Sequence, residues 1–532
     1  MRIHWQRSAL ALICVAAMAC SSSSVTPDDF DEFGEPTDGD FIAEDDGDFE
    51  ADEVVFEPDV PEFRQLSFSD GEPEVVDGEE VDGISSFRVG NVDVIHMPTP
   101  ANEVVAARLY LRGGSANLDE QLAGIEQLAL SVAVNGGTES TPKDEFNARL
   151  DAIGSSVGST TNRDFSGITM RSVRDHFDET WELFMESVFE PAFEADEVEL
   201  RRDRQLASIK SIVDNPDRLV SEVARDLIFA DHPYYFRQIG TQDTVSQFTA
   251  EQLRAWQRHL IAPERMLLVV VGNIERDDLV DKVKTGLGRL APTGVEVPAL
   301  PGISPDKPAL RVEHLDLPTN YILGYYSTPS IDHEDYPALV LGTQHLRDRL
   351  FEEVRTKRNL TYAVSSGIGQ RGDNVGFLYV TAVDPGATMP VIFDEVERLQ
   401  TELVDAGDLE QVRNVYLTRH YQGLETNASI AGQLGRAELI GGDWTRSQRF
   451  LDDINEVTPE DIRRVAQTYM SNYQFGVVGD PDDVPPKLFG VQTDQVETVD
   501  EIDDSEVEDA EEMPQAPPEA GSEAPAPEQS AR

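Results

Sequence analysis

Hydrophobic residues recur along the chain with two different periods, which predicts a mixture of helices and strands. Between residues 177 and 188 the apolar side chains follow helical spacing and form one face: Phe177, Trp181, Phe184, Met185 and Val188. We expect this aromatic face to pack in a core rather than to bind a ligand. The apolar run 266–271 and the alternating pattern over 165–173 predict strands. Strands interleaved with amphipathic helices are typical of an α+β fold in which antiparallel sheets are layered with helices.

The predicted order of elements occurs twice. Thr249 begins a helix that leads to the strand 266–271, and Thr458, followed by a proline, begins a helix that leads to the strand 473–478. Thr at the N-cap and Pro at the first helical position are both favoured at helix starts. The copies lie about 210 residues apart, which indicates two duplicated domains rather than a solenoid. We expect the first strands of the two halves at 104–111 and 321–326.

The composition changes outside this region. The chain has 532 residues, with 43 basic and 101 acidic side chains and a formal net charge of −58. Of the acids, 24 lie in 21–83 and 14 in 491–532, each stretch with a single basic residue. Such segments self-repel and cannot bury a core, so disordered acidic tails are expected. Residues 20–83 would form a tether after the N-terminus, and residues 485–532 would form a C-terminal tail. The two halves then occupy 84–296 and 297–484. The negative charge argues against nucleic acid as a partner.

The N-terminus has the pattern of an export signal. Two arginines precede a short apolar run over residues 8–19, which is too short for a transmembrane helix. The run ends in Ala-Met-Ala-Cys, which resembles the bacterial lipoprotein box and implies a signal peptide over 1–19 and lipidation of Cys20. Ser21 after it suggests the outer membrane. We expect a lipid-anchored protein of the bacterial cell envelope; the alternative is a plain secreted protein cut near Ala19.

A helix predicted over 122–138 follows the segment Arg-Gly-Gly-Ser at 112–115 and ends in Gly137-Thr138. This order resembles the first half of the pitrilysin/insulinase family of zinc metallopeptidases. In that family the helix carries His-x-x-Glu-His, whose two histidines bind zinc while the Glu activates a water. Alignment on Gly124 places three other residues at these positions: Gln127, Leu130 and Ser131.

None of these three side chains is a zinc ligand or a base, and sliding the alignment by one residue recovers no His. The family's third ligand, a Glu, falls near Ala207 or Ser208. The nine His include no pair at i, i+4, and His232 before Pro233 resembles the family's structural His-Pro turn. Both Cys are N-terminal, so no thiolate metal site is expected in the folded part. The resemblance therefore implies no metal in this chain and zinc only in a partner subunit.

The segment 349–363 (RLFEEVRTKRNLTYA) resembles the family's second-half segment, in which an Arg and a Tyr seven residues later hold the substrate opposite the zinc. The matching residues are Arg355 and Tyr362. A guanidinium and a phenol donate hydrogen bonds to a peptide carbonyl, which makes the pairing chemically sensible. The alternative is that Arg355 caps a helix end and Tyr362 packs in a strand, with no ligand.

Three hypotheses follow. The first is a split peptidase in which this chain supplies Arg355 and Tyr362 to a zinc-bearing partner of the same family, acting on unfolded peptides. The second is a stand-alone pseudo-peptidase that binds peptides or scaffolds envelope proteins. The third is an autonomous zinc metalloendopeptidase with unconventional ligands. The first explains why the zinc positions are replaced while the substrate-holding pair is present.

Overall fold

The computed structural model describes residues 58–297, 299–492 and 496–499. The predicted signal peptide, Cys20 and the end of the predicted tail lie outside these residues. Within the described part, every helix is too short or too polar to span a bilayer.

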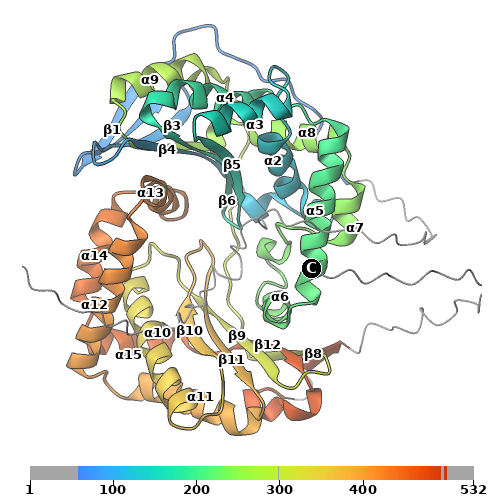
Figure 1. Ribbon diagram of the computed structural model, residues 1–532. Helices are drawn as coiled ribbons and strands as arrows, with labels where there is room; N and C mark the ends of the chain where they lie inside the picture. Colours follow the sequence, from blue (N-terminus) through green and yellow to red (C-terminus); the bar gives the residue numbers. More distant parts are fainter. Residues whose placement is uncertain (1–57, 298, 493–495, 500–532) are drawn as a thin grey trace, which may run out of the picture.

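The first half is a seven-stranded sheet with helices layered on one face (Figure 1). The strand order is β1-β2-β3-β7-β4-β6-β5; β3 and β7 run parallel, and the other neighbours run antiparallel. The strands are β1 (Val75–Val81), β2 (Ile84–Val89), β3 (Val92–Pro98), β4 (Val104–Arg112), β5 (Ser156–Thr161), β6 (Phe165–Val173) and β7 (Met266–Gly272). The helices are α2 (Ile125–Asn135), α3 (Lys143–Ala152), α4 (Phe177–Phe189), α5 (Ala195–Val213), α6 (Pro216–Ile228), α7 (Gln242–Gln247), α8 (Ala250–Leu260) and α9 (Arg276–Thr285).

The second half is a six-stranded sheet in the order β10-β11-β9-β12-β8-β13, in which β8 runs parallel to both its neighbours. Its strands are β8 (Ala309–His314), β9 (Asn320–Thr328), β10 (Val364–Ile368), β11 (Asn374–Ala382), β12 (Gln474–Gly479) and β13 (Val496–Val499). Its helices are α10 (Tyr336–Leu350), α11 (Pro385–Thr401), α12 (Ala406–Gly423), α13 (Asn427–Gly441), α14 (Arg446–Glu456) and α15 (Pro459–Tyr469).

The two sheets share one topology, which confirms the prediction of two homologous halves in an α+β fold. The order β5-β6-β4-β7-β3 in the first half corresponds to β10-β11-β9-β12-β8 in the second. Thr249 and Thr458 both form capping boxes at the starts of α8 and α15, as their sequence pattern predicted. The strands that follow these helices, β7 and β12, are buried along their whole length.

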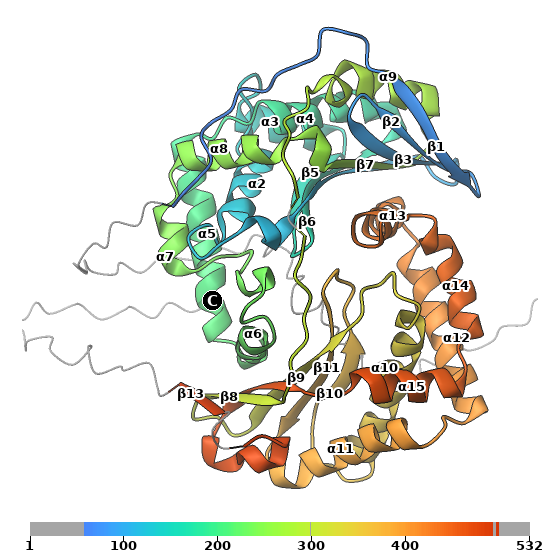
Figure 2. The same cartoon turned by 180° about the vertical axis from the view of Figure 1, so that it is seen from behind.

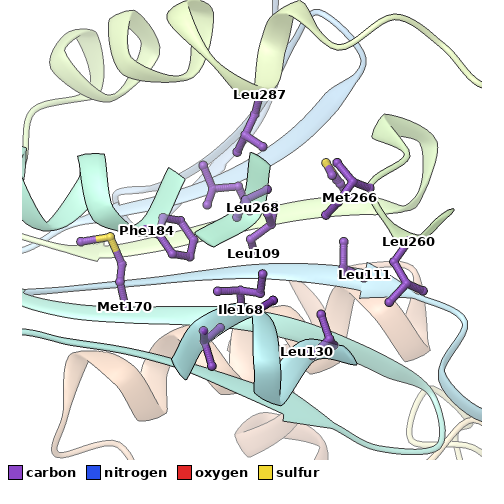
Figure 3. Packing of buried hydrophobic residues seen from close by; sticks show 14 of the residues in the cluster. Leu109, Leu111, Leu130, Ile168, Met170, Phe184, Leu260, Met266, Leu268 and Leu287 are labelled. Atoms are coloured by element: carbon purple, nitrogen blue, oxygen red, sulfur yellow. The ribbon is translucent and has the colours of Figure 1, made fainter. Parts of the chain in front are cut away.

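The main core of the first half lies between its sheet and the covering helices. Figure 3 shows this layer, in which Leu109 of β4 and Leu268 of β7 lie near Phe184 of α4. The aromatic face predicted over 177–188 belongs to this core: Trp181 and Phe184 are buried, and Met185 packs against the cluster. The prediction that this face is structural is confirmed.

One helix from each half packs on the sheet of the other half, as the two views show (Figures 1 and 2). Helix α6 packs on the second sheet, where Val220 and Ala224 share a buried cluster with Phe377. Helix α13 packs on β4 and β7 of the first sheet, where Ala431 and Leu434 share a cluster with Tyr110, whose ring lies against Gly435. Because both exchanged helices cover apolar strands, the halves are held together by core packing as well as by the linker between them.

The ordered body begins earlier than the sequence predicted. Residues 58–83 were expected to be tether, yet β1 pairs with β2 through Asp82 and Gly83, both with positive φ. A two-residue turn with φ > 0 at both positions is the preferred hairpin connection, and Asp-Gly is its usual sequence. Upstream of β1, Arg64 donates to the carbonyl oxygens of Arg258 and Ile261 at the end of α8, at 3.0 and 3.1 Å.

The predicted start of the C-terminal tail at 485 is also too early. Phe489 and Val491 are buried in the second-half core, and β13 adds a strand beside β8. At both boundaries the acidic composition predicted disorder, although a few apolar residues there pack against partners that lie far away in the sequence.

Candidate functional site

The helix that matches the family's zinc helix is α2. It begins after Gly124, whose φ of +91° and close packing against Val245 and Gly240 leave no room for a side chain. Gln127 and Ser131 are half-buried. Leu130, in contrast, is fully buried in the main core, in the same cluster as Ile168 of β6 (Figure 3). Under the predicted alignment on Gly124, the family's general-base position would therefore fall on a core leucine.

Helix α5 lies along α2. Gln205 donates to the carbonyl oxygens of Gly124 and Ile239, at 3.1 and 2.8 Å, and Glu197 forms a buried ion pair with Arg201 at 2.7 Å. Ser208, one of the two positions predicted for the third ligand, is half-buried and donates to the carbonyl oxygen of Arg204 in its own helix.

These residues do not fit a zinc ion. A catalytic zinc site requires three ligands drawn from His, Cys and carboxylates, whereas Gln127, Leu130 and Ser131 offer an amide, an alkyl group and a hydroxyl. Across the residues that the structure describes, no group of three or more His, Cys, Asp or Glu side chains is arranged to hold a metal ion. We therefore derive no catalytic step through zinc in this chain.

Sequence reasoning missed a buried acid beside these positions. Glu126 is completely buried and accepts a hydrogen bond from the hydroxyl of Ser166 in β6. Burial raises the pKa of the Glu126 carboxyl to about 7, against the opposing effects of Ser166 and the charge of Arg265. The sequence around Glu126 did not predict its burial, because its hydrogen-bond partner lies in a strand 40 residues away.

The second candidate region follows α10. There the helix widens into a π-helical turn over Phe351–Thr356, in which the Lys357 N–H donates to the Glu352 carbonyl at 2.9 Å. Asn359, with φ of +51°, then reverses the chain, and its N–H donates to the Arg355 carbonyl at 3.0 Å. Such π-turns are rare and frequently occur at functional sites. The reversal brings the residue before β10 back over the end of the helix.

The two predicted substrate-holding residues lie together at this reversal. The Arg355 guanidinium carbon lies 5.1 Å from the ring centroid of Tyr362 and 4.9 Å from that of Phe351. Tyr362 is 83% exposed and Phe351 43% exposed. The alternative of a Tyr362 packed inside a strand does not match this position, which precedes β10. Phe351 lies in the segment 349–363 but was not predicted as a site residue. Its spacing of one helical turn before Arg355 is the signal that could have predicted their contact.

In the described structure Arg355 has no ionic partner, because the neighbouring acids Glu352 and Glu353 pair with other basic residues. Hydrogen bonds from Lys357 and Arg358, at 2.8 and 2.7 Å, lower the pKa of Glu353 to about 2. Glu352 lies 3.6 Å from the Lys357 ammonium group. The ten residues 349–358 contain four basic and two acidic side chains, so this stretch is locally positive in a chain of net charge −58.

Both edge strands beside these regions lack a neighbour on one side within the described sheets: β5 in the first half and β10 in the second. Unpaired strand edges accept extended peptides through main-chain hydrogen bonds. The strand β5 packs against α2, and β10 directly follows Tyr362.

A polar contact joins the two halves. His232 lies 2.7 Å from Asp373 of the β10–β11 turn, and its other ring nitrogen accepts a bond from the Tyr234 N–H at 3.1 Å. The Tyr234 hydroxyl and the Gly372 N–H both donate to Asp164 in the β5–β6 turn. The residue predicted as a structural His-Pro turn thus connects the first half to the second.

Comparison with known proteins agrees with this architecture. A family model described as Insulinase (Peptidase family M16) matches residues 93–235, and one described as Peptidase M16 inactive domain matches residues 247–416. An uncharacterized zinc protease of Mycobacterium leprae is 26% identical over 402 residues, which cover 73% of this chain and 90% of that protein. Subunit 1 of the mitochondrial cytochrome b-c1 complex of Caenorhabditis elegans is 20% identical over 391 residues, which cover 70% of this chain and 82% of that protein.

Solved structures show the same fold. The peptidase M16 inactive domain from Pseudomonas fluorescens has a TM-score of 0.67 at 20% identity, and covers 74% of this chain and 97% of its own. The periplasmic protease PqqL from Escherichia coli has a TM-score of 0.68 at 15% identity, and covers 78% of this chain and 48% of its own.

Proposed function

The chain belongs to the pitrilysin/insulinase family of metallopeptidases, and on that premise we propose that it is a non-catalytic, substrate-binding member. Its role is to supply Arg355 and Tyr362 to a zinc-bearing subunit of the same family, which together with it forms a peptidase for unfolded peptides. The zinc belongs to the partner, because the α2 residues of this chain do not fit the ion.

The single observation that carries this proposal is the contact between Arg355 and Tyr362 on an exposed surface. A guanidinium and a phenol held side by side donate to a peptide carbonyl oxygen and stabilise negative charge that forms on it. Aromatic contacts supply no hydrogen-bond acceptor in the way that a carboxylate would, so the N–H donors of the guanidinium remain available to a ligand. The unpaired edge of β10 next to Tyr362 offers main-chain groups to the same extended peptide.

The test is peptidase activity of the purified soluble region, alone and co-expressed with a family member that carries an intact His-x-x-Glu-His. We expect cleavage only by the pair, and a loss of at least about tenfold in kcat/KM for R355A, because a charge-assisted hydrogen bond contributes about 1.5–3 kcal/mol. R358A is the matched control, since Arg358 pairs with Glu353 and contacts neither ring. Equal cleavage by R355A and unmodified protein would show that the assigned role is wrong.

A second candidate is a stand-alone pseudo-peptidase that binds peptides or scaffolds other envelope proteins. The similarity to a relative named as subunit 1 of the cytochrome b-c1 complex favours the scaffolding form of this candidate, because that name describes a component of an assembly. Peptide binding by the isolated chain without turnover in any pairing would favour this function over the first. Stoichiometric zinc in the purified chain, with activity removed by a chelator, would instead support an autonomous peptidase.

We also propose that the protein is lipid-anchored through Cys20 in the bacterial cell envelope, at the outer membrane. The supporting feature is the Ala-Met-Ala-Cys segment after a short apolar run. Radiolabelled palmitate should label the unmodified protein but not C20S, and only the unmodified protein should sediment with outer-membrane vesicles. Labelling of C20S would refute the anchor.

A further inference from the structure

Phe351 lies one helical turn before Arg355, on the same face of the π-helical turn. Its ring centroid is 4.9 Å from the guanidinium carbon, slightly closer than the ring of Tyr362 at 5.1 Å. The ring is 43% exposed, unlike the buried aromatic side chains of the second-half core. Phe351 does not belong to that core cluster, and its ring contacts the cation of Arg355 instead.

The surroundings favour aromatic support of Arg355 over ionic support. Glu353, two residues earlier, is engaged by Lys357 and Arg358 and also lies 3.5 Å from Arg349. A carboxylate bound to Arg355 would occupy the N–H donors that a ligand needs. An aromatic ring attracts the cation through its face and leaves those donors unoccupied.

We propose that Phe351 is a positioning residue that holds the Arg355 guanidinium ready for a peptide carbonyl oxygen. This inference rests on the proposed function of Arg355 and extends it. A long arginine side chain loses rotamer freedom when it binds a ligand. A ring that restricts the side chain in the free protein lowers that loss, which is how preorganisation increases affinity.

Three variants separate the role of the ring from that of apolar volume. F351L keeps an apolar side chain of similar reach but removes the π face, F351Y keeps the π face, and R355A removes the cation. The probe is a fluorescein-labelled unfolded oligopeptide titrated against the full soluble region and followed by anisotropy. Thermal unfolding of each variant reports whether the fold is intact.

We expect F351L to weaken peptide binding about two- to fivefold, from the usual strength of an exposed cation–π contact. F351Y should bind as the unmodified protein does, and R355A should weaken binding by at least about tenfold. The double variant F351L/R355A should bind no more weakly than R355A alone, because Phe351 acts through Arg355. In ¹⁵N relaxation measurements, the Arg355 Nε–H order parameter should fall in F351L and not in F351Y.

Two results distinguish failure of this inference from failure of the proposed function. If R355A binds the peptide normally, the proposed site itself is wrong. If R355A loses affinity but F351L retains both full affinity and the Arg355 order parameter, the site stands and the positioning role of Phe351 is refuted. An F351Y variant as weak as F351L would also refute it, because the ring face is present in both Phe and Tyr.

Discussion

Replacing Glu126 by Gln tests whether this chain carries an uncompensated buried acid directly before Gln127. Glu126 is completely buried, and one carboxylate oxygen accepts the Ser166 hydroxyl bond. The other accepts no hydrogen bond of good geometry, although the Trp256 and Asn117 side chains lie close enough to oppose the rise in the carboxyl pKa. Gln has nearly the same shape and no charge. Its amide can donate to the Ser166 oxygen while its own oxygen takes the remaining position.

The magnitude follows from proton linkage. Burial raises the Glu126 pKa from 4.5 to about 7. In the unfolded chain the group ionises at the lower pKa, so unfolding is favoured increasingly as the pH rises from 4.5 to 7. A shift of about 2.5 units at 1.36 kcal/mol per unit corresponds to about 3 kcal/mol. The protonated carboxyl therefore stabilises the fold fully below pH 4.5, and this contribution is lost as the pH rises through 7.

The assay is urea unfolding of the unmodified protein and E126Q at a series of pH values from 4.5 to about 8, followed by tryptophan fluorescence. Other buried acids affect both proteins equally, so the difference between them isolates Glu126. E126Q should match the unmodified protein at the acid end and be more stable by up to about 3 kcal/mol at the alkaline end. A difference that stays constant across the pH range would refute the assignment of a buried, protonated carboxyl.

Three further predictions concern packing and the contact between the halves. L130E should destabilise the first half by about 4 kcal/mol or more, because it places a carboxyl in the core, whereas S131E at a half-buried position should cost less than about 1 kcal/mol; urea unfolding measures both. G435A should cost about 1–3 kcal/mol, since its Cβ would lie 2.2 Å from a Tyr110 ring carbon. G423A, with open space around it, should be neutral or slightly stabilising; thermal unfolding measures both glycine variants. D373A should lower the free energy of unfolding by about 1–3 kcal/mol and speed tryptic cleavage between the halves. D373N keeps an acceptor oxygen for His232, so both effects should be smaller in that variant.

Each of these has a result that contradicts it. Equal stabilities of L130E and S131E would mean that Leu130 faces solvent. A G435A protein as stable as the unmodified one would mean that α13 does not pack closely on the first sheet. If D373A and D373N behave like the unmodified protein, the His232 contact does not hold the halves together.

The sequence predicted the elements whose signals are local. The Thr249 and Thr458 capping patterns gave two helix starts and, through their repetition, the duplication of the domain. The hairpin of β1 and β2 was missed although Asp82-Gly83 is a strong turn signal, because the acidic composition around it outweighed the turn in the interpretation. Composition describes an average over a segment, whereas a strand needs only a few residues with partners in a sheet.

The candidate site was predicted in part. Arg355 and Tyr362 were identified from their spacing in the family pattern, and the structure places them in contact. The π-helical turn, the left-handed Asn359 and the engagement of Glu353 by its basic neighbours were not predicted, because they depend on how the end of α10 meets β10. Glu126 was not singled out, because its burial is created by a strand and a turn distant in the sequence.

By itself, the sequence indicated the family and the two-fold repetition of the α+β half, and it predicted that Gln127, Leu130 and Ser131 replace the family's zinc motif. These are properties of side-chain identity and of short-range periodicity, which a linear chain displays directly. The tertiary structure alone decided that α6 and α13 are exchanged between the halves, that Leu130 is core, and that the Phe351 ring lies against the Arg355 guanidinium. Each of these depends on which distant surfaces exclude water from one another, and that is fixed only when the whole chain has packed.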